Sequence, residues 1–415
     1  MTLAARFAGS ASKENRRVIE ILDDVARRGD EAVAEYTEKF DAVRLKPEQY
    51  RIDKAALKKA HSEIDGHLLA SLRQAIENVR EYQSEIFIGG NSFSSGTTGI
   101  KYTPIERVGL CVPGASVPLP STVIMTAVPA QVAGVCEIAV VSPPRYDGGI
   151  HPVILAVCHE LGIDEVYRVG GVQAVAALAA GTQSIRKVDK IVGPGNKWVQ
   201  SAKKNVAGDY VGIDSVAGPS EVLIIADEEA NPAWVAADML SQAEHAADSS
   251  AIVVTDSEPL AKQILKELEK QIAELPRSAD AQQSLKEFGA VIVVDGMSKA
   301  VEIANDFAAE HLQIQCGGKS KQVVDNIRNA GAIFIGPYTP VAVGDYWAGP
   351  SHTLPTGTTA RFASALTSND FIKSISIIEY GKEKLAESAE DIVRLAEVEG
   401  LDAHARSIKI RQTHP

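Results

Sequence analysis

The stretch GPSEVLIIADEEANPAWVAADMLSQAEHAAD, residues 218–248, joins an apolar segment of strand length to an amphipathic helix, and this alternation recurs along most of the chain. Residues 222–226 form a short apolar run, which is typical of a buried strand. Asn231 followed by Pro232 is typical of an N-cap and the first position of a helix. We therefore predict a strand over 222–226 and a helix over about 231–247, which is one unit of an α/β fold.

The predicted helix carries polar side chains on its apolar face. At about 100° per residue, Asp238, Gln242 and His245 share this face with Trp, Val and Met. An unpartnered buried polar group costs about 1–3 kcal/mol, so these side chains need partners. Either the face lies at a solvated edge, or Gln242 and His245 point at a bound ion or ligand.

Strand-length apolar runs alternate with helical segments in two series, one before Gly218 and one after it. Such a βαβ series forms a parallel sheet with helices on its faces. We expect an α/β protein with two Rossmann-like parallel-sheet lobes and a ligand in a cleft between them. The predicted strands cover 108–112, 137–141, 166–169 and 190–192 in the first series, and 222–226, 251–255, 290–294, 312–315 and 332–335 in the second.

The expected domain limits follow these two series. We assign residues 1–107, of which 13 to about 88 are expected to be mostly helical, together with 221–366 to one lobe, and residues 108–220 to the other. Residues 336–368 are rich in Gly, Pro, Ser and Thr yet contain Tyr and Trp. A long loop of this composition is expected to be functional. Residues 367–415 form a small C-terminal segment that is helical and extended.

Composition disfavours several classes of protein. The 415-residue chain has a formal net charge of −12, which disfavours binding to nucleic acid. Its four cysteines form no CxxC pair, which argues against a disulfide framework or a thiolate metal site. The first residues lack an apolar run long enough for a signal peptide, and no run reaches the roughly 18 apolar residues of a membrane span. We expect a cytoplasmic protein that does not bind a membrane.

Two glycine-rich turns follow predicted strands of the first series. VGGVQAVAALAAG (169–181) and GPGN (193–196) each stand between a strand and a helix. Such glycines could let a phosphate approach a helix N-terminus, although tight strand-to-helix turns need glycine in any case. Because both turns lie at the same end of one parallel sheet, together they favour a nucleotide site.

An adjacent Glu and His begin another predicted strand. Glu310 and His311 directly precede the predicted strand 312–315, and at the start of this strand both side chains could reach a cleft. A carboxylate and an imidazole together are suited to acid/base catalysis. Alternatively, His311 interacts with the last carbonyl groups of the preceding helix.

Five segments in this order and at these spacings closely resemble histidinol dehydrogenases: GPSEVLIIAD, LSQAEH, AEHLQIQ, GDYWAGPSHTLPT and EGLDAH. The similarity includes both glycine-rich turns and the N-terminal helical region, so it covers nearly the whole chain. It implies NAD-dependent, zinc-requiring oxidation of L-histidinol to L-histidine through L-histidinal, a four-electron reaction that forms the last two steps of histidine biosynthesis. It further implies a homodimer with one zinc ion per subunit and NAD on the 108–220 lobe. Residues 367–415 would contribute to dimerisation and to the partner's active site.

The resemblance also assigns roles to individual residues. His311 matches the base that takes the alcohol proton and contacts the substrate, and Glu310 matches the residue that activates water. The four implied zinc ligands also count as substrate contacts. They include no thiolate, which fits a catalytic rather than a closed structural site. These ligands are Gln242, His245, Asp345 and, from the partner subunit, His404.

Further positions match contacts to the substrate and the cofactor. Gln173 and Asn196, both in the glycine-rich turns, match positions that contact NAD. The chain departs from the family at GLCVPGA (109–115), because Cys111 stands where the family often has a Tyr that contacts the cofactor. Loss of that ring removes roughly 1 kcal/mol of packing. The matching substrate positions are Ser220, His352 and, from the partner subunit, Glu399.

Two other functions compete with this interpretation. A relative with the same zinc and NAD apparatus could act on another small polyol or amino alcohol, but His352 and Glu399 favour a basic aminated substrate. A two-lobed binding protein without catalysis would not need the Glu310-His311 pair. Asp238 has no assigned role: it could orient His245 or merely line the cleft.

Overall fold

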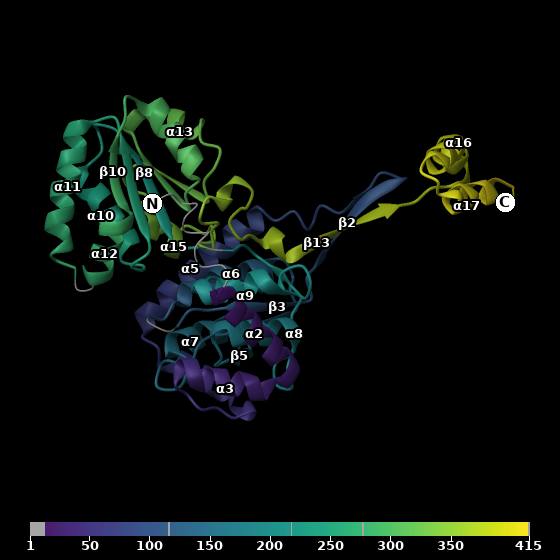
Figure 1. Cartoon of the computed structure of the whole chain (residues 1–415), viewed down its shortest axis with the longest axis horizontal. Coiled ribbons are helices and arrows are strands. Elements are labelled where there is room, and N and C mark those ends of the chain that lie inside the picture. Colours follow the sequence, from purple (N-terminus) through teal and green to yellow (C-terminus); the bar gives the residue numbers. More distant parts are fainter. Residues whose placement is uncertain (1–12, 115–116, 217, 276–277, 414–415) are drawn as a thin grey trace. The chain divides into compact units, whose positions relative to one another are not determined.

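The computed structural model describes residues 13–114, 117–216, 218–275 and 278–413. The chain, traced in Figure 1, divides into two compact units. Unit 1 comprises Met1–Phe87 and Ile105–Phe371, and unit 2 comprises Ile88–Pro104 and Ile372–Pro415. Ala115, at the end of the GLCVPGA segment, and residues 1–12, on which the expectation about a signal peptide rests, lie outside the described residues.

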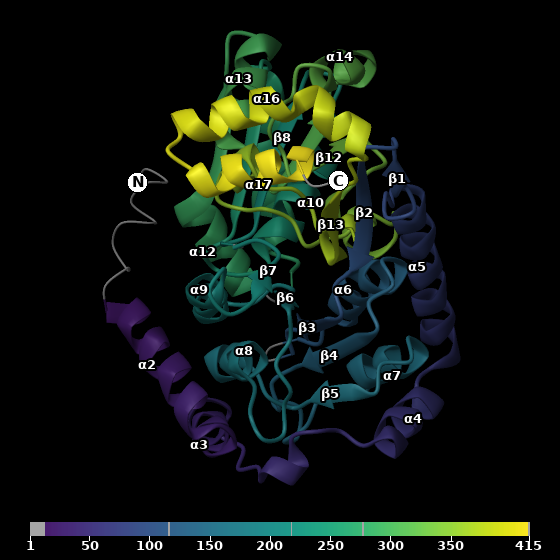
Figure 2. The ribbon, with the colours of Figure 1, turned by 90° about the vertical axis from the view of Figure 1, so that its right-hand side faces the viewer.

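The first lobe of unit 1 is a five-stranded parallel sheet with the order β5-β4-β3-β6-β7, as Figure 2 shows. The earliest strand stands in the middle and the chain moves outward first on one side and then on the other, as in a Rossmann half. The sequence predicted every strand but the two-residue β7. The elements are β3 (Arg107–Cys111), α6 (Pro120–Val132), β4 (Glu137–Val141), α7 (Pro152–Glu160), β5 (Glu165–Tyr167), α8 (Gly171–Ala180), β6 (Lys190–Val192), α9 (Lys197–Val206) and β7 (Gly212–Ile213).

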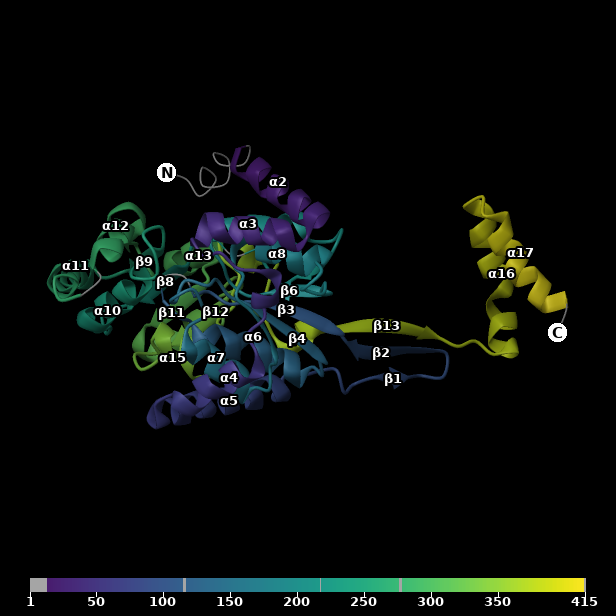
Figure 3. The ribbon, with the colours of Figure 1, turned by 90° about the horizontal axis from the view of Figure 1, so that it is seen from below.

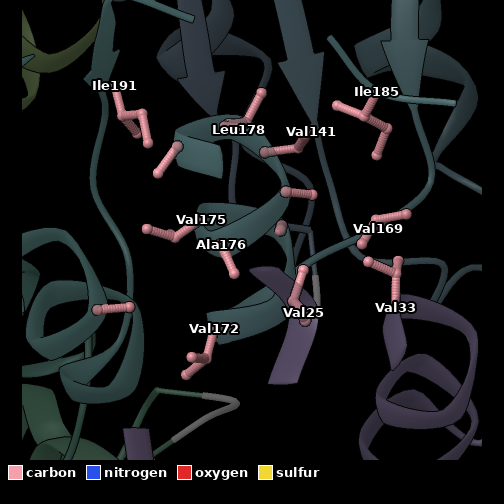
Figure 4. Close-up of a cluster of buried hydrophobic side chains, with 14 of the residues drawn as sticks. Val25, Val33, Val141, Val169, Val172, Val175, Ala176, Leu178, Ile185 and Ile191 are labelled. Carbon is pink, nitrogen blue, oxygen red and sulfur yellow. The ribbon is translucent and has the colours of Figure 1, made fainter. Parts of the chain in front are cut away.

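Helix α8 lies at the centre of the apolar core of this lobe (Figure 4). Its sequence GVQAVAALAA is apolar on nearly every side, as expected of a helix that is covered all round. Leu178 lies against Gly109 of β3, where a Cβ atom would come within 2.8 Å of the Leu178 Cδ1 atom. Gly109 therefore allows α8 to approach the sheet closely.

The N-terminal helices cover this first lobe. Helix α2 contributes Val18, Ile21 and Val25 to the core around α8, and α4 and α5 pack against α7 and α6. The apolar stripe of α2 is buried against the apolar α8. The expected grouping of residues 1–107 with 221–366 and the other domain limits stay predictions. These helices are α2 (Lys13–Arg28), α3 (Asp30–Asp41), α4 (Lys54–Glu63) and α5 (Gly66–Glu85), with a 3₁₀ turn, η1 (Pro47–Gln49).

The second lobe of unit 1 repeats the same topology. Its parallel sheet has the order β10-β9-β8-β11-β12, again with the earliest strand in the middle. All five strands were predicted, whereas α12 was not. The elements are β8 (Glu221–Ala226), α10 (Pro232–Ala243), β9 (Ser250–Thr255), α11 (Glu258–Ile272), α12 (Ser278–Phe288), β10 (Gly289–Val293), α13 (Met297–Phe307), β11 (His311–Gln315), η2 (Gly317–Lys319), α14 (Ser320–Val324) and β12 (Ala332–Ile335).

Strand β8 is buried on both faces of this second sheet. Val222 and Ile224 belong to the core beneath α10 and α11, whereas Leu223 and Ile225 belong to the core beneath α13 and α14. Successive side chains of a strand point to opposite faces, so an uninterrupted apolar run is what a central parallel strand requires.

Helix α10 begins as predicted and ends earlier. The Asn231 side chain caps it by accepting hydrogen bonds from the backbone N–H groups of Ala233 and Trp234. The helix ends at Ala243, and His245 lies in the bend that follows. The His245 N–H donates to the Gln242 carbonyl oxygen, three residues back, which tightens the last turn.

The long loop at 336–368 contains a short helix, α15 (Val341–Tyr346), and a 3₁₀ turn, η3 (Thr359–Arg361); η4 (Ser368–Phe371) follows it. Hydrogen bonds tie the loop to the first lobe. The Asn78 side chain donates to the Trp347 carbonyl oxygen at 2.9 Å, and the Ser351 hydroxyl donates to the Met125 carbonyl oxygen at 3.0 Å. The loop is therefore an ordered connection between the two lobes of unit 1.

Unit 2 combines a small antiparallel sheet with a pair of helices. Strand β2 pairs with β1 and with β13 (Figure 3), and α16 packs against α17. The sequence predicts a helix over 380–399, which corresponds to α16, whereas α17 was not predicted. No helix in the described part of the chain is both long and apolar enough to cross a membrane. The elements are β1 (Phe93–Ser94), β2 (Thr98–Pro104), β13 (Ile372–Ile378), α16 (Lys382–Val398) and α17 (Asp402–Thr413).

Candidate active site

The amino ends of two neighbouring central strands bring the predicted acid/base residues together. His311, the first residue of β11, stands opposite Val222 of β8 in the sheet register. Ser220 and Glu310 directly precede these strands, so they lie at the same edge of the sheet. The two strands therefore place Ser220, Glu310 and His311 in one site.

Glu310 is a buried carboxylic acid. It accepts one hydrogen bond from the Ser220 hydroxyl and another, at 2.9 Å, from the Glu221 backbone N–H. Burial raises the pKa of Glu310 to about 7, although both hydrogen bonds oppose the rise. A carboxyl group with this pKa can donate and accept protons near neutral pH.

His311 is buried beside Glu310 in a defined orientation. Its Nδ1 atom lies 3.1 Å from the Glu221 carbonyl oxygen, which can only accept, so Nδ1 carries the proton and Nε2 is left with a lone pair. Among the described residues, Nε2 has no hydrogen-bond partner, and it lies 3.9 Å from Asp345 Oδ1. Burial lowers the pKa of His311. The imidazole is therefore a neutral base whose Nε2 atom is free to accept a proton.

Helix α15 and the loop after it complete this side of the site. Burial raises the pKa of Asp345, and the charges of His311 and His245 oppose the rise, which places all three groups within electrostatic reach. Burial lowers the pKa of His352 to about 4. Its Nε2 atom lies 3.5 Å from the Thr122 hydroxyl of α6.

Gln242 has the features of a ligand residue. Its side chain is fully buried, and neither polar atom of its amide has a hydrogen-bond partner within the described residues. His245 is exposed, and its Nδ1 atom bonds to the Ser241 carbonyl oxygen at 2.9 Å, which leaves Nε2 available. An amide oxygen, an imidazole nitrogen and the Asp345 carboxylate form a donor set that fits a divalent metal.

The described residues contain no cluster of three or more His, Cys, Asp or Glu side chains placed to hold a metal ion. The predicted zinc site uses only three residues of these types, namely His245, Asp345 and His404, and its fourth ligand is Gln242. His404 and Glu399 both belong to unit 2, where their side chains are exposed. Within unit 1 the predicted site thus consists of Gln242, His245 and Asp345.

Asp238 forms a buried network that the sequence did not indicate. Its Oδ2 atom accepts hydrogen bonds from the side-chain amides of Gln313 at 2.7 Å and Gln315 at 2.9 Å. Burial raises the pKa of Asp238 to about 6. Asp238 therefore links α10 to β11, while the Ser241 carbonyl holds the His245 ring. Two glutamines in alternate positions of the apolar strand HLQIQ were the available signal for this network.

A second group of predicted residues lies at the carboxyl edge of the first sheet. A pocket there is lined by the ends of β3 and β4 and by both glycine-rich turns, and its lining includes Cys111, Gly171 and Asn196. This is the point of a Rossmann sheet where the strand order reverses. The side chain of Asn196 also caps α9, accepting hydrogen bonds from the Trp198 and Val199 N–H groups.

Gln173 and Cys111 differ in what they offer to a ligand at this pocket. The Gln173 amide is buried without a hydrogen-bond partner in the described part of the chain, and a Cβ atom on Gly171 would come within 2.8 Å of its Oε1 atom. It thus lies beside the pocket with unused polar atoms. Burial raises the pKa of Cys111 to about 12. Cys111 is therefore a neutral thiol, which makes it a poor nucleophile.

A repeated Rossmann-type lobe, with glycine-rich turns in one copy and a buried acid/base pair in the other, defines an α/β protein whose site is suited to acid/base catalysis. Comparison with known proteins is more specific. The family model "Histidinol dehydrogenase" matches residues 5–412. The chain is 45% identical over 410 residues to the histidinol dehydrogenase of Geobacillus kaustophilus, covering 98% of this chain and 96% of that protein. It is 44% identical over 411 residues to that of Bacillus subtilis, covering 98% and 95%.

A solved structure agrees with the sequence comparisons. The crystal structure of histidinol dehydrogenase from Elizabethkingia anophelis matches with a TM-score of 0.92 at 36% identity, covering 98% of this chain and 94% of that one. The chain therefore belongs to the histidinol dehydrogenase family, and it is an oxidoreductase. This confirms the predicted family and the α/β fold. It also excludes the alternative that the chain is a binding protein without catalytic activity.

Proposed function

We propose that this chain oxidises L-histidinol to L-histidine through L-histidinal, with two molecules of NAD as oxidant and zinc as a bound metal. These are the last two steps of histidine biosynthesis. Family membership supports the substrate and the pathway. The observation that carries the chemistry is the buried pair of Glu310, with a pKa of about 7, and His311, whose Nε2 lone pair is free.

His311 is the proposed base of the first oxidation. Loss of hydride from the alcohol carbon requires the hydroxyl proton to leave as well. Nε2 can accept this proton, because Nδ1 is committed to the Glu221 carbonyl and burial disfavours the charged imidazolium before the reaction. Asp345, 3.9 Å from Nε2, stabilises the imidazolium once it has formed.

Glu310 is the proposed base of the second oxidation. An aldehyde has no hydroxyl proton to lose, so it must first add water and become a hydrate that can give up a second hydride. The Glu310 carboxylate takes a proton from that water, and its pKa near neutrality keeps a useful fraction in the basic form. The Ser220 hydroxyl and the Glu221 N–H hold the carboxylate in place.

The proposed zinc ligands are Gln242, His245, Asp345 and His404 of the partner subunit. The unpaired, buried amide of Gln242 supports this set, because a bound cation would satisfy its oxygen. When bound, zinc would hold the imidazole and amine of histidinol and so orient the alcohol carbon. Ser220, His352 and Glu399 of the partner subunit are the other proposed substrate contacts, and His311 also contacts the substrate.

NAD is proposed to bind at the carboxyl edge of the first sheet. The reversal of strand order, the two glycine-rich turns and the unused amide of Gln173 support this position. Gln173, Asn196 and Cys111 are the proposed contacts. Cys111 would contribute only packing, because its thiol is neutral.

Electron balance provides the test of this function. One histidinol and one water should yield histidine with two hydrides transferred, and therefore two NADH. We expect the purified protein to form two NADH per L-histidinol and to lose this activity when a chelator removes zinc, with recovery when zinc is restored. A yield of one NADH, or activity that survives complete removal of metal, would contradict the proposal.

The active form is proposed to be a cytoplasmic homodimer with shared sites. Two of the proposed site residues, Glu399 and His404, lie in unit 2, whereas the others lie in unit 1. A site completed by a second subunit accounts for this division. Light scattering of the purified protein should give twice the mass of one chain.

A further inference from the structure

A buried ion pair lies directly behind the GPGN turn of the first lobe. Lys203 of α9 and Asp214, the residue after β7, form a salt bridge in which their side chains are 1% and 4% exposed. Burying two charges removes their hydration, and their mutual attraction often fails to offset that loss, so such a pair contributes little to stability on its own. It is more useful for fixing geometry.

The pair holds both polar groups of one peptide residue. The Gly193 backbone N–H donates to Asp214 Oδ2 at 2.7 Å. The Lys203 ammonium group donates to the Gly193 carbonyl oxygen at 2.8 Å and to the other oxygen of Asp214. Lys203, Asp214 and Gly193 therefore form a closed ring of charge-assisted hydrogen bonds.

Gly193 is also fixed against the neighbouring strand. Its φ angle is +109°, and a Cβ atom there would come within 2.4 Å of the Cys111 carbonyl oxygen at the end of β3. The turn is thus held against β3 on one side and by the ion pair on the other. Pro194, Gly195 and Asn196, the next three residues, line the pocket proposed for NAD.

We propose that Lys203 and Asp214 are positioning residues that hold the GPGN turn in the shape that binds the dinucleotide. This inference rests on the proposed function, since it assumes that NAD occupies the pocket. Lys203 is not itself a phosphate ligand, because it is 1% exposed and its charge is paired with Asp214. The pair acts on cofactor affinity through preorganisation of the turn.

The test is direct titration of NAD into the full-length dimer without histidinol, followed by calorimetry, for Lys203→Met, Asp214→Asn and the double variant. Each single variant should weaken NAD binding by about tenfold or more, because it leaves one charge of the pair buried and uncompensated beside Gly193, which displaces the turn. The double variant should recover part of this loss, because the asparagine oxygen still accepts the Gly193 N–H and no unpaired charge is buried. The KM for histidinol should stay within about threefold in all three variants.

The matched control is the ion-pair network of the buried Arg107 at the opposite edge of the same sheet. Arg107 bridges Glu137 at 2.8 Å and Glu165 at 2.6 Å at the amino ends of β3, β4 and β5. Arg107→Met should lower the midpoint of thermal unfolding without changing NAD affinity. The salt dependence of NAD binding should be the same in Lys203→Met and wild type, whereas a direct phosphate contact would reduce it.

The outcomes separate the two proposals. Wild-type protein that fails to bind NAD would overturn the proposed function. If wild type binds NAD and the folded Lys203→Met and Asp214→Asn variants bind it with the same affinity, the positioning role alone would be overturned. A reduced salt dependence of NAD binding in Lys203→Met would also overturn it. If Lys203→Met does not fold, the near-isosteric Asp214→Asn and the double variant decide the question.

Discussion

At the scale of single residues, the two proposed bases of the site differ in their hydrogen bonds and in the direction of their pKa shifts. Both side chains are buried and both touch the Glu221 backbone, but Glu310 accepts from its N–H whereas His311 donates to its carbonyl. Burial disfavours the charged form of each, raising the pKa of the acid and lowering that of the imidazole. Under the proposed function, His311 takes the hydroxyl proton of the alcohol and Glu310 takes a proton from water.

Replacement of His311 tests its role as the base of alcohol oxidation. We expect His311→Ala to lower kcat with L-histidinol by about 10²–10⁴-fold, the usual contribution of a general base. Oxidation of added L-histidinal should fall far less, because that step uses Glu310. Zinc content, measured by atomic absorption, should stay at the wild-type level; a variant that loses its metal would show that His311 is a ligand instead.

Glu310 should impose a pH dependence on stability. Its pKa is raised from 4.5 to about 7, so the folded protein keeps a proton that the unfolded chain releases between these values. The contribution of Glu310 to stability is therefore largest below pH 4.5 and is lost as pH rises to 7, by at most about 3 kcal/mol at 1.36 kcal/mol per unit.

Glu310→Gln lacks this titration and keeps the hydrogen bonds from Ser220 and Glu221. In urea unfolding of metal-free protein, the variant should gain stability over wild type as pH rises from 4.5 to 7, with no further change above that. If wild type instead became more stable relative to the variant over this pH range, the Glu310 carboxyl group would be ionised in the folded protein throughout the range.

At the scale of elements, the middle and the carboxyl end of β11 are joined to the middle of α10 through Asp238. The carboxylate receives one amide from Gln313 and one from Gln315, so the helix that carries Gln242 is registered against the strand that begins with His311. Without Asp238, both buried amides would lose a partner.

We expect Asp238→Ala to reduce the free energy of unfolding by about 3 kcal/mol, since each unsatisfied buried group costs about 1–3 kcal/mol. It should also weaken zinc binding, because Gln242 lies one helical turn further along α10. Asp238→Asn should have a smaller effect on both, because its amide can pair with flipped glutamine amides. Equal zinc affinity in all three proteins would limit Asp238 to a structural role.

The elements that sequence reasoning recovered share a physical cause. The central strands of both sheets are buried on two faces, so β8 and β9 read as uninterrupted apolar runs. Strands β2 and β13 are largely exposed and pair across a long separation in the chain, so neither shows a local pattern. The end of α10 depends on its last-turn geometry, which periodicity does not reveal.

The site residues differ in how far the sequence predicted them. Gln242 and His245 were noticed as polar residues on an apolar helix, and the family resemblance supplied their partners. Lys203 was missed because KWVQSAKKNV has the charge of a solvated helix, although this lysine is buried. Its proposed role depends on Asp214, which directly follows strand β7.

At the scale of the whole molecule, the proposed zinc ligands are divided between the two units, with three in unit 1 and His404 in unit 2. Unit 1 has the same strand order in both lobes, with the acid/base pair in the second lobe and the glycine-rich turns in the first. Unit 2 carries exposed apolar side chains beside the remaining site residues, including Leu395 and Val398 near Glu399. An exposed apolar surface of this kind is expected where another subunit binds.

Subunit exchange tests whether His404 acts on the partner's site. Glu310→Ala subunits and His404→Ala subunits should each be inactive as homodimers. In a hybrid dimer, one site combines an intact Glu310 with an intact His404 of the partner subunit, while the other site lacks both. Random mixing makes half of the dimers hybrid, so the mixture should regain about a quarter of wild-type activity if the subunits pair in a symmetric dimer.

The same mixture excludes the alternative arrangement. If His404 completed the site of its own chain, neither kind of subunit would contain a working site in any pairing, and no activity would return. Mixing two differently tagged His404→Ala preparations controls for recovery caused by the exchange procedure itself. Because zinc requires His404 under the proposal, a Glu310→Ala homodimer should bind two zinc ions, a His404→Ala homodimer none and a hybrid dimer one. Hybrid dimers isolated by their two tags should therefore contain one zinc ion each, whereas two zinc ions per hybrid dimer would separate His404 from the metal site.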